Sequence, residues 1–372
     1  MKQNIMKSNK LFSIIVVCKN EENVIRQTIK SILAQSCGDF EVIIHDGKST
    51  DQTIQIIDEL EASDKRIKLK SEEDSGIYNA MNKALAEAKG EYIYFLNAGD
   101  IFYDREVLSS VEKCIREKKT DIIIGKYLSK KHEQKVIVNP IKKENLFSYI
   151  KKGNGLCHQS IFARKECFSD GFDEQYIFSA DFDWVCRQIK EERKVENIDI
   201  IIANYDKYGV SSLAKNWKKV QEECKDIIQR HFQIESELAD VYYEERYKEI
   251  KSRMTLEYMN DFLALKQKNK NLSSYFEKNN IQTIAIYGYH FLGQRLYEEL
   301  SGGTLKVKYV IDRNSTLYEA SIPFVSLNEE LENVDAIVIT PIFEYYEIKA
   351  VLEKKIDCII LSIEDVINGM YE

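Results

Sequence analysis

From residue 11 onward, short apolar runs alternate with stretches in which apolar residues recur every three or four positions. The short runs predict strands and the periodic stretches predict amphipathic helices. We expect strands at Phe12–Cys18, Glu41–His45, Ile67–Leu69, Tyr92–Leu96 and Ile122–Gly125, and helices at Glu22–Gln35, Thr53–Glu61, Ile77–Ala88 and Arg105–Lys118. This alternation is typical of a mostly parallel sheet with flanking helices. A mixed stretch continues to about residue 212.

Residues 214–279 contain no glycine or proline and no strand pattern, and they predict two or three amphipathic helices. One apolar stripe consists of Trp217, Val220, Cys224, Ile227 and Ile228, and a second of Val241, Ile250, Met254, Tyr258, Phe262 and Leu265. We expect this segment to be a connector, with homo-oligomerisation through it as a further role. Peripheral membrane contact is less favoured because the basic bias is weak.

The alternation returns in residues 280–372. Strands are expected at Thr283–Tyr287, Val307–Ile311, Ala336–Ile339 and Cys358–Ser362, and helices at Leu292–Leu300 and Tyr345–Lys354. This pattern predicts a second, small α/β domain of about ninety residues. The chain is therefore divided into a tail (1–10), a first α/β domain (11–213), a helical connector (214–279) and a small Rossmann-like domain (280–372).

Composition and charge narrow the classes of function. The net charge of −8 gives no overall basic footprint for nucleic acid, so no nucleic-acid partner is expected. The eight cysteines form no C-x-x-C pair, which indicates reduced thiols in the cytoplasm. No run approaches the ~20 apolar residues of a membrane span, although peripheral contact at the inner face of a membrane stays open.

Polar residues follow three of the expected strands, at 18–22, 45–51 and 97–100. Ligands of open parallel sheets bind outside the carboxyl ends of the strands. These three segments therefore predict one binding site at one edge of the sheet.

Five ordered segments, SIIVVCKNEE, HDGKSTDQT, EEDSGIYNAMNKALAEAKGEYIYFLNAGD, CHQSIFARKECF and SADFDW, resemble glycosyltransferase family 2. The resemblance covers residues 11–212. It implies an α/β fold of the GT-A type, which binds nucleotide sugars, and the transfer of a sugar to a hydroxyl of a glycan, lipid-linked or protein-linked acceptor. Bacterial surface polysaccharide or glycoconjugate synthesis is the implied setting.

The resemblance implies nucleotide contacts at the strand ends and at the start of the third helix. The implied residues are Cys18, Asn20, Glu22, Asp46, Asp74, Asn82, Lys83, Asn97 and Ala98. The position of Asp46 hydrogen-bonds the nucleobase in the family, and a carboxylate that accepts an imide N–H favours uracil and hence a UDP-sugar. Asp51 is expected to cap the following helix instead.

The family holds a divalent cation with a D-x-D motif, but this chain reads Asn97-Ala98-Gly99-Asp100. Asp100 is the one carboxylate left in this segment. A single carboxylate can hold Mn²⁺ or Mg²⁺ when the diphosphate supplies further ligands. The alternative is that Asp100 only ends the loop.

An inverting transfer needs a base opposite the leaving group. The resemblance places this base at Asp181, although Ala180 stands where many relatives have Glu, and Asp183 is the second candidate. Trp184 fits either a sugar-stacking position or the core. His158 and Gln159 are candidates for phosphate or acceptor contacts, and residues 205–212 for a lid.

In the small domain, Gly288 and Gly293 and the later Asp312 approach a dinucleotide-binding fingerprint, but His290 replaces the middle glycine. Tyr345 and Lys349 have the Y-x-x-x-K spacing of short-chain dehydrogenases, which we attribute to chance. A scaffold, assembly or acceptor-delivery role is expected for this domain. Two rivals to the transferase stay open: a non-catalytic sugar-nucleotide-binding protein and a dehydrogenase or epimerase run by the small domain.

Overall fold

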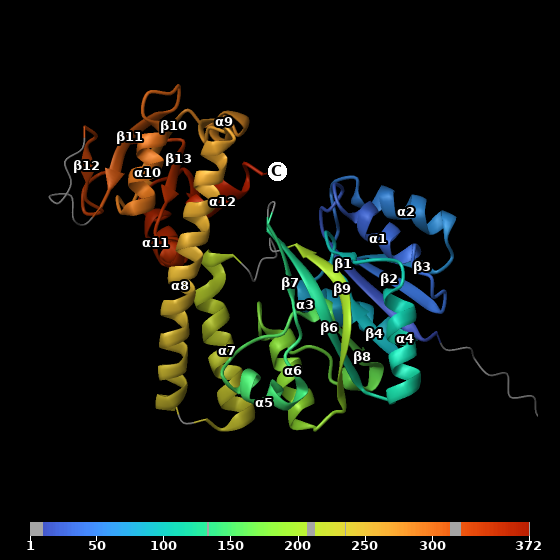
Figure 1. The fold of residues 1–372 in the computed structure, drawn as a ribbon. Helices are drawn as coiled ribbons and strands as arrows, with labels where there is room; N and C mark the ends of the chain where they lie inside the picture. The colour runs from blue at the N-terminus through green and yellow to red at the C-terminus, as the bar shows by residue number, and fades with distance from the viewer. Residues whose placement is uncertain (1–9, 132–133, 207–212, 235, 313–320, 372) are drawn as a thin grey trace, which may run out of the picture. The chain divides into compact units, whose positions relative to one another are not determined.

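The chain folds into two compact units in a computed structural model that describes residues 10–131, 134–206, 213–234, 236–312 and 321–371 (Figure 1). Unit 1 consists of Met1–Gly209 and Glu222–Tyr242, and unit 2 of Val210–Gln221 and Tyr243–Glu372. Residues 214–279, expected as a connector, are thus divided between the two units. The expected tail lies outside the described residues except for Lys10.

Unit 1 is built on a nine-stranded sheet with the order β3-β2-β1-β4-β8-β6-β9-β5, and β7 pairs with β6. The strands are β1 (Phe12–Cys18), β2 (Phe40–Asp46), β3 (Ile67–Ser71), β4 (Tyr92–Phe95), β5 (Ile101–Phe102), β6 (Ile122–Lys131), β7 (Gln134–Val138), β8 (Ile161–Arg164) and β9 (Val195–Asp206). The four strands β3, β2, β1 and β4 are parallel neighbours, whereas β8 is antiparallel to both β4 and β6.

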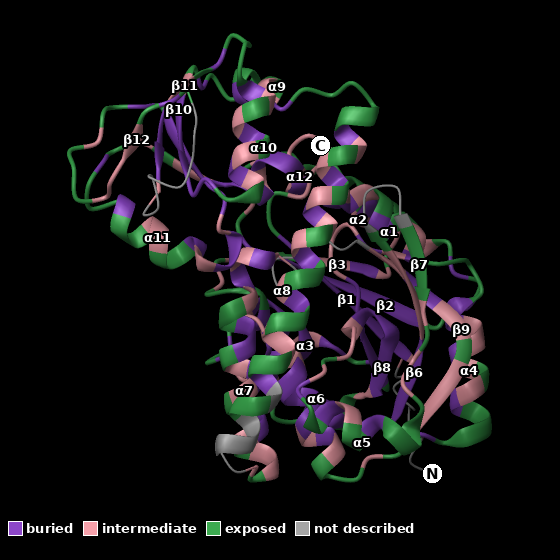
Figure 2. Ribbon diagram, turned by 60° about the vertical axis from the view of Figure 1, so that its left-hand side comes forward, coloured by how far each residue is buried: buried purple, intermediate pink, exposed green. Residues whose placement is uncertain are grey.

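The helices of unit 1 follow its strands in the expected order. They are α1 (Ile25–Leu33), α2 (Thr53–Ser63), α3 (Ile77–Glu87), α4 (Val107–Lys118), α5 (Lys143–Lys151) and α6 (Ala180–Lys190), with 3-10 turns η1 (His158–Ser160) and η2 (Lys165–Phe168). All residues of β1 and β2 are buried, as a strand covered on both faces requires (Figure 2). Apolar side chains of α1, α2 and α4 pack with these strands in one core.

Three helices follow: α7 (Trp217–Phe232) after the 3-10 turn η4 (Ala214–Asn216), α8 (Ser236–Gln267) and the short α9 (Ser273–Lys278). The first stripe is confirmed as a packing face, since Val220, Cys224, Ile227 and Ile228 are buried. Most of the second stripe is used within the chain. Ile250, Met254, Tyr258 and Leu265 are buried in the core of unit 2, whereas Val241 is exposed.

Unit 2 has a five-stranded parallel sheet with the order β12-β11-β10-β13-β14. Its elements are β10 (Thr283–Tyr287), α10 (Phe291–Leu300), β11 (Lys306–Ile311), β12 (Phe324–Val325), β13 (Ala336–Ile339), η6 (Ile342–Glu344), α11 (Tyr345–Leu352), β14 (Ile359–Ser362) and α12 (Ile363–Asn368). The strand order reverses at β10, as in Rossmann-like sheets. The sequence pattern missed β12 and α12, which are only two and six residues long.

Among the described residues, no helix combines the length and apolar character that crossing a membrane requires. All eight cysteines are free thiols.

Candidate functional site

The three polar segments expected at one site lie together because β2, β1 and β4 are adjacent parallel strands. Cys18 at the end of β1 is in register with Asp46 at the end of β2. On the other side of β1, the amide of Leu96, just past β4, donates to the carbonyl of Ile15. The carboxyl ends of these strands therefore form a shared edge, as the sequence predicted.

Asp46 is fully buried, and its carboxylate is held by two serines. It accepts from the Ser49 hydroxyl, from the Ser49 amide at 3.0 Å and from the Ser71 hydroxyl at 2.7 Å. Burial, and next the charge of Asp46, raise the pKa of the Cys18 thiol, which lies 3.9 Å from that carboxylate. Cys18 is thus a neutral neighbour of Asp46.

The segment after β1 and the segment after β2 bind each other. The Asn20 amide donates to Ser49 Oγ at 2.7 Å, and Asn20 Oδ1 accepts from the Thr50 amide at 2.8 Å. Glu22 accepts from the Gln52 amide at 2.9 Å. Asn20 lies in the left-handed region with φ 57°, which Asn tolerates better than most residues. These two predicted nucleotide residues fix the shape of the edge.

Asp51 holds the entry to α2. Its carboxylate accepts from the amide of Thr53 at 3.0 Å and from the amide of Glu22 at 3.2 Å. The structural role expected for Asp51 therefore fits its contacts.

Asp74 lies over the glycine that follows Asp46. A Cβ on Gly47 would come within 2.4 Å of Asp74 Oδ2, so only glycine leaves room for this carboxylate. The other oxygen of Asp74 accepts from the Gly76 amide at 3.1 Å. His45 Nε2, which has no hydrogen-bond partner among the described residues, is 4.0 Å from Asp74, and burial lowers the pKa of His45.

Asn82 and Lys83 make protein contacts that the sequence did not predict. The Asn82 side chain donates to Phe172 O at 2.9 Å and to Glu174 at 2.8 Å, and it accepts from the Phe172 amide at 2.8 Å. Its amide is thus committed to the loop after η2. Lys83 Nζ donates to the carbonyl of Glu73 at 2.5 Å, beside the segment that carries Asp74.

Asp181, the expected base, lies in the first turn of α6 and is held on both oxygens. Its Oδ1 accepts from the Tyr78 hydroxyl at 3.0 Å and from the Phe182 amide at 2.9 Å. Its Oδ2 lies 3.1 Å from His158 Nδ1. Burial, and next the charge of Asp181, raise the pKa of Tyr78, so the phenol stays protonated and donates.

His158 joins Asp181 to the segment after β4. Its Nε2 is 3.2 Å from Asn97 Nδ2, on the ring side opposite Asp181. An amide NH₂ can only donate, so Nε2 accepts and Nδ1 carries the proton toward Asp181. Asn97 Oδ1 is buried and has no partner among the described residues. The tertiary structure therefore assembles Asn97, His158, Asp181 and Tyr78 into one cluster.

Asp100 is nearly buried, with 4% of its surface exposed, and Oδ2 accepts from the Gln159 side chain at 2.9 Å. Ala98 packs against the core of unit 1. Among the described residues, no three His, Cys, Asp or Glu side chains are grouped as metal ligands. The carboxylate of Asp100 and the unpaired Asn97 Oδ1 are hard oxygen donors in one turn, which suit a cation that takes further ligands from phosphate.

The expectations for Asp183 and for Trp184 as a sugar platform were wrong. Asp183 is 1% exposed and is held by Arg187 Nε at 3.0 Å and His231 Nε2 at 2.7 Å. Trp184 is buried, stacks on Phe168 and donates to the carbonyl of Cys167 at 2.7 Å. Because a helix turns about 100° per residue, Asp183 points away from Asp181, and the hydrogen bond to Cys167 holds Trp184 in the core.

Sequence reasoning missed two residues that position Asp181. Tyr78 reaches it from α3 across 103 positions. Glu223 of α7 accepts from the amides of Ile177 and Phe178 at 2.9 and 3.0 Å, just before the start of α6. The only sequence signal for Tyr78 was an aromatic residue just after the glycine that precedes α3.

The predicted lid, residues 205–212, lies mostly outside the described residues, which resume at residue 213.

In unit 2, the residues that resemble a dinucleotide-binding fingerprint contact the backbone of unit 2 itself. Asp312 accepts from the Tyr289 amide at 2.7 Å, and a Cβ on Gly293 would meet the carbonyl of Gly288 at 2.0 Å. Burial raises the pKa of Tyr345 to about 12, and its hydroxyl donates to Ile360 O. A dehydrogenase tyrosine requires the opposite shift, so the Y-x-x-x-K spacing is structural here.

Comparisons with known proteins agree with the fold of unit 1. Residues 13–172 match the model of the family described as glycosyl transferase family 2. A PGL/p-HBAD biosynthesis glycosyltransferase of Mycobacterium tuberculosis is 29% identical over 204 residues, which cover 54% of this chain and 78% of that protein. Chondroitin synthase of Pasteurella multocida is 27% identical over 209 residues, which cover 55% of this chain and 22% of that protein.

Two solved structures are also similar. TarS of S. aureus has a TM-score of 0.49 at 21% identity, covering 62% of this chain and 69% of that one. A mannosyltransferase of Pyrobaculum calidifontis, in complex with GDP-Man and Mn²⁺, has a TM-score of 0.48 at 14% identity, covering 63% and 70%.

The fold class expected from the sequence is confirmed, with an α/β sheet domain of the GT-A type first and a small parallel-sheet domain after the helices. Over residues 13–172, the chain therefore resembles glycosyl transferase family 2.

Proposed function

We propose that this chain transfers a sugar, with inversion, from a nucleotide-diphosphate sugar to a hydroxyl of a glycan, lipid-linked or protein-linked acceptor. A UDP-sugar is the favoured donor. The observation that carries the proposal is the Asp181 carboxylate, which is oriented on both oxygens and still partly exposed, at 24% of its side chain.

Asp181 retains capacity for one more hydrogen bond. An ionised carboxylate offers about four lone-pair sites. Tyr78 and the Phe182 amide use two on Oδ1, and His158 uses one on Oδ2. The remaining site on Oδ2 suits an acceptor hydroxyl, whose proton Asp181 takes as the oxygen attacks the anomeric carbon.

His158 and Asn97 position this base in the proposal. Because Asn97 donates to Nε2 of His158, the proton of His158 is on Nδ1, which donates it in a hydrogen bond to Asp181. Asn97 Oδ1 faces no described donor, so a donor-sugar hydroxyl is a suitable partner for it.

Asp46 is proposed to contact the nucleobase. Its four lone-pair sites are used by Ser49, Ser71 and the weak donor Cys18. A base imide N–H that binds Asp46 takes the place of one hydroxyl donor, and Ser71 is the simpler one to turn away since Ser49 also binds through its backbone. Asn20, Glu22 and Asp74 keep the surrounding segments in place.

Asp100 is proposed to hold Mn²⁺ or Mg²⁺, with further oxygen ligands from the diphosphate. A cation there would neutralise the charge that the leaving diphosphate gains. Gln159 keeps the Asp100 carboxylate oriented through its 2.9 Å hydrogen bond.

The test is donor turnover by Asp181→Asn in the full chain, beside Asp58→Asn on the exposed face of α2 as a charge-matched control. We expect the turnover rate of Asp181→Asn to fall about 10²–10⁴-fold, the usual contribution of a general base. Binding of the donor should persist. Full turnover by Asp181→Asn would eliminate this residue as the base, and binding without turnover by the unsubstituted chain would favour the non-catalytic alternative.

A further inference from the structure

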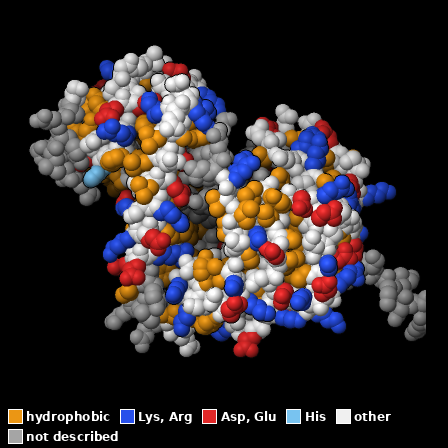
Figure 3. All heavy atoms as spheres, in the orientation of Figure 1, with side chains coloured by type: hydrophobic (Ala, Val, Ile, Leu, Met, Phe, Trp, Pro, Cys, Tyr) orange, Lys and Arg blue, Asp and Glu red, His pale blue; other side chains and the backbone are white. Residues whose placement is uncertain are grey.

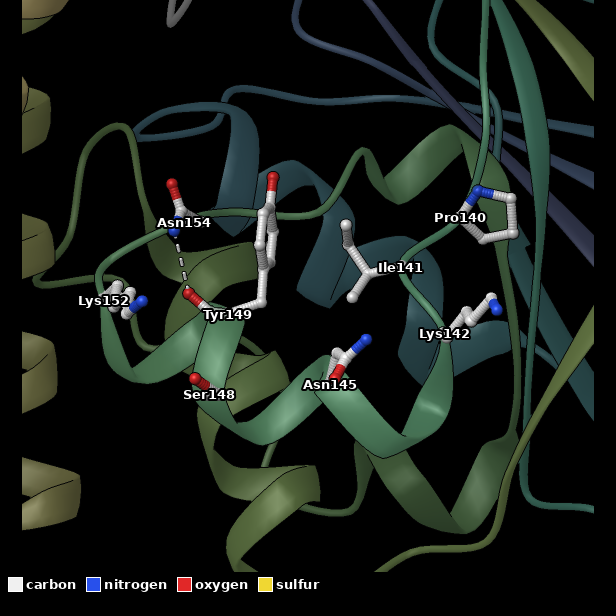
Figure 4. A pocket seen from close by; sticks show the side chains of 8 residues that line it. All are labelled: Pro140, Ile141, Lys142, Asn145, Ser148, Tyr149, Lys152 and Asn154. Atoms are coloured by element: carbon white, nitrogen blue, oxygen red, sulfur yellow. Dashed lines mark hydrogen bonds between the residues drawn. The ribbon is translucent and has the colours of Figure 1, made fainter.

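A cavity of about 540 Å³ lies in unit 1 between the end of β7 and the segment before His158. Its lining includes Ile141, Lys142, Asn145, Ser148, Tyr149 and Lys152. In Figure 4 the two lysines lie on opposite sides, with Tyr149 and Ile141 between them. None of the described side chains that line it is acidic.

The segment around this cavity is basic, whereas the chain as a whole is acidic. Residues 126–152 contain eight lysines and two glutamates, whereas the whole chain has a net charge of −8. Lys126 and Lys143 pair with Asp199 and Glu196. Within the described part of the chain, neither Lys142 nor Lys152 forms an ion pair. The cavity is thus a local concentration of positive charge in an acidic protein.

Exposed apolar side chains lie on β7, the strand that precedes the cavity-lining segment. Val136 and Ile137 of β7 are 59% and 51% exposed, and they precede the lining segment by only a few residues. Neighbouring strand residues point to opposite faces, so this end of β7 offers apolar surface on both faces. In Figure 3, hydrophobic side chains gather on the viewed face of unit 1 over the strands β6, β7 and β9.

Hydrogen bonds to β9 hold one side of the cavity. The Asn197 side chain of β9 donates to Ile141 O at 3.2 Å and accepts from the Lys143 amide at 3.1 Å, on either side of Lys142. At the other end of the lining segment, the Cβ position of Gly155 is 4.0 Å from the ring of Phe182, the residue after Asp181. The cavity therefore lies on the same segment of the chain that leads to His158.

We infer that this cavity binds the phosphate of a lipid-phosphate acceptor, whose apolar chain lies against the exposed end of β7. This inference rests on the proposed function and narrows its acceptor class. Two unpaired lysines suit a phosphate or diphosphate group, the amide, hydroxyl and phenol groups suit a sugar next to it, and the apolar end of β7 suits the lipid.

The experiment measures binding of farnesyl phosphate, a soluble lipid phosphate, to the full chain by calorimetry, with farnesol and inorganic phosphate as comparison ligands. We expect farnesyl phosphate to bind more tightly than either comparison ligand. Lys142→Glu/Lys152→Glu should weaken its binding at least tenfold, and Lys142→Gln/Lys152→Gln less. Val136→Ser/Ile137→Ser should weaken the binding of farnesyl phosphate but leave the binding of inorganic phosphate unchanged.

The control is Lys65→Glu/Lys113→Glu, which makes the same charge change at exposed positions on other elements. All variants must unfold at the temperature of the unsubstituted chain. Equal binding of inorganic phosphate and farnesyl phosphate, equal binding of farnesol, or a loss shared by the control would each overturn the inference. A chain that binds UDP but not farnesyl phosphate would overturn it while leaving the proposed transferase intact.

Discussion

At the scale of single residues, the catalytic cluster depends on hydrogen bonds between side chains that are distant in the sequence. Tyr78, His158 and Asn97 come from α3, η1 and the segment after β4. Tyr78 and His158 donate to Asp181, and Asn97 donates to His158. Such an arrangement orients a base and leaves its remaining lone pair toward solvent.

Tyr78→Phe should lower the turnover rate about tenfold, since a hydrogen bond to a charged group is worth about 1.5–3 kcal/mol. His158→Asn should lower the turnover rate as well, because it removes the donor to Oδ2 of Asp181. Turnover is measured under donor saturation.

Tyr103→Phe, at an exposed tyrosine, is the matched control for Tyr78→Phe. A purely structural Tyr78 would change stability and leave the turnover rate of the folded protein unchanged. Unchanged turnover in both Tyr78→Phe and His158→Asn would therefore contradict the positioning role.

At the scale of elements, close approaches of backbone decide which glycines the sheet requires. Gly90 enters β4 beside β1, and a Cβ there would lie 2.4 Å from the Ser13 amide nitrogen and 2.5 Å from the Phe12 carbonyl carbon. Gly38, before β2, has no heavy atom within 4 Å of its Cβ position.

Gly90→Ala should destabilise unit 1 by about 1–3 kcal/mol, because the clash is with backbone that cannot turn away. Gly38→Ala should be neutral or stabilising by about 0.4–1 kcal/mol, because alanine restricts the unfolded chain. Both are measured by denaturant unfolding. Equal stabilities of the two variants would contradict the close approach of Gly90 to β1.

Helix α7 acts on the catalytic site through Glu223. Glu223→Ala leaves two amides, at residues 177 and 178, without their acceptor just before Asp181. We expect a loss of about 0.5–1.5 kcal/mol in unfolding free energy, the net value of a protein hydrogen bond, together with a lower turnover rate. The neighbouring Glu222→Ala, at an exposed position, should change neither. Equal turnover in the two variants would show that α7 does not position Asp181.

At the scale of the whole molecule, unit 2 is assembled from segments far apart in the chain. Glu364 in α12 is fully buried and accepts from the amides of Ala214 and Lys215 and from the Tyr258 hydroxyl. Burial, partly offset by the amide donors of Ala214 and Lys215, raises the pKa of Glu364 to about 6. A single carboxylate thus links η4, α8 and α12.

The raised pKa makes the stability of unit 2 depend on pH. Between the ordinary pKa of Glu and pH 6 the folded chain binds the proton more tightly than the unfolded chain. The stabilisation, roughly 2 kcal/mol, is therefore complete below about pH 4.3 and is lost as pH rises through about 6. Glu364→Gln should remove this dependence in denaturant unfolding of unit 2 at pH 5 and pH 7.

The exposed Glu330→Gln is the control and should keep the dependence. If Glu364→Gln unfolds with the same pH dependence as the unsubstituted chain, another group is responsible for it.

Most elements could be predicted because their periodicity is a local property of the chain. The strands at Phe12–Cys18, Thr283–Tyr287 and Ala336–Ile339 have the bounds that the apolar runs predicted. The edge formed by residues 18–22, 45–51 and 97–100 followed from the parallel order of β2, β1 and β4. The two-residue β12 could not be predicted, since so short a run has no period.

The directions of the side chains were decided only by the tertiary structure. Asp181, Asp183 and Trp184 are close in sequence, yet Asp181 lies at the surface cluster while Asp183 meets Arg187 and His231 and Trp184 enters the core. The sequence alone determined where most of the strands and helices lie, because burial patterns repeat locally. Which polar groups meet depended on packing between elements up to 150 residues apart, because a side chain finds its partner only where the folded backbone aims it.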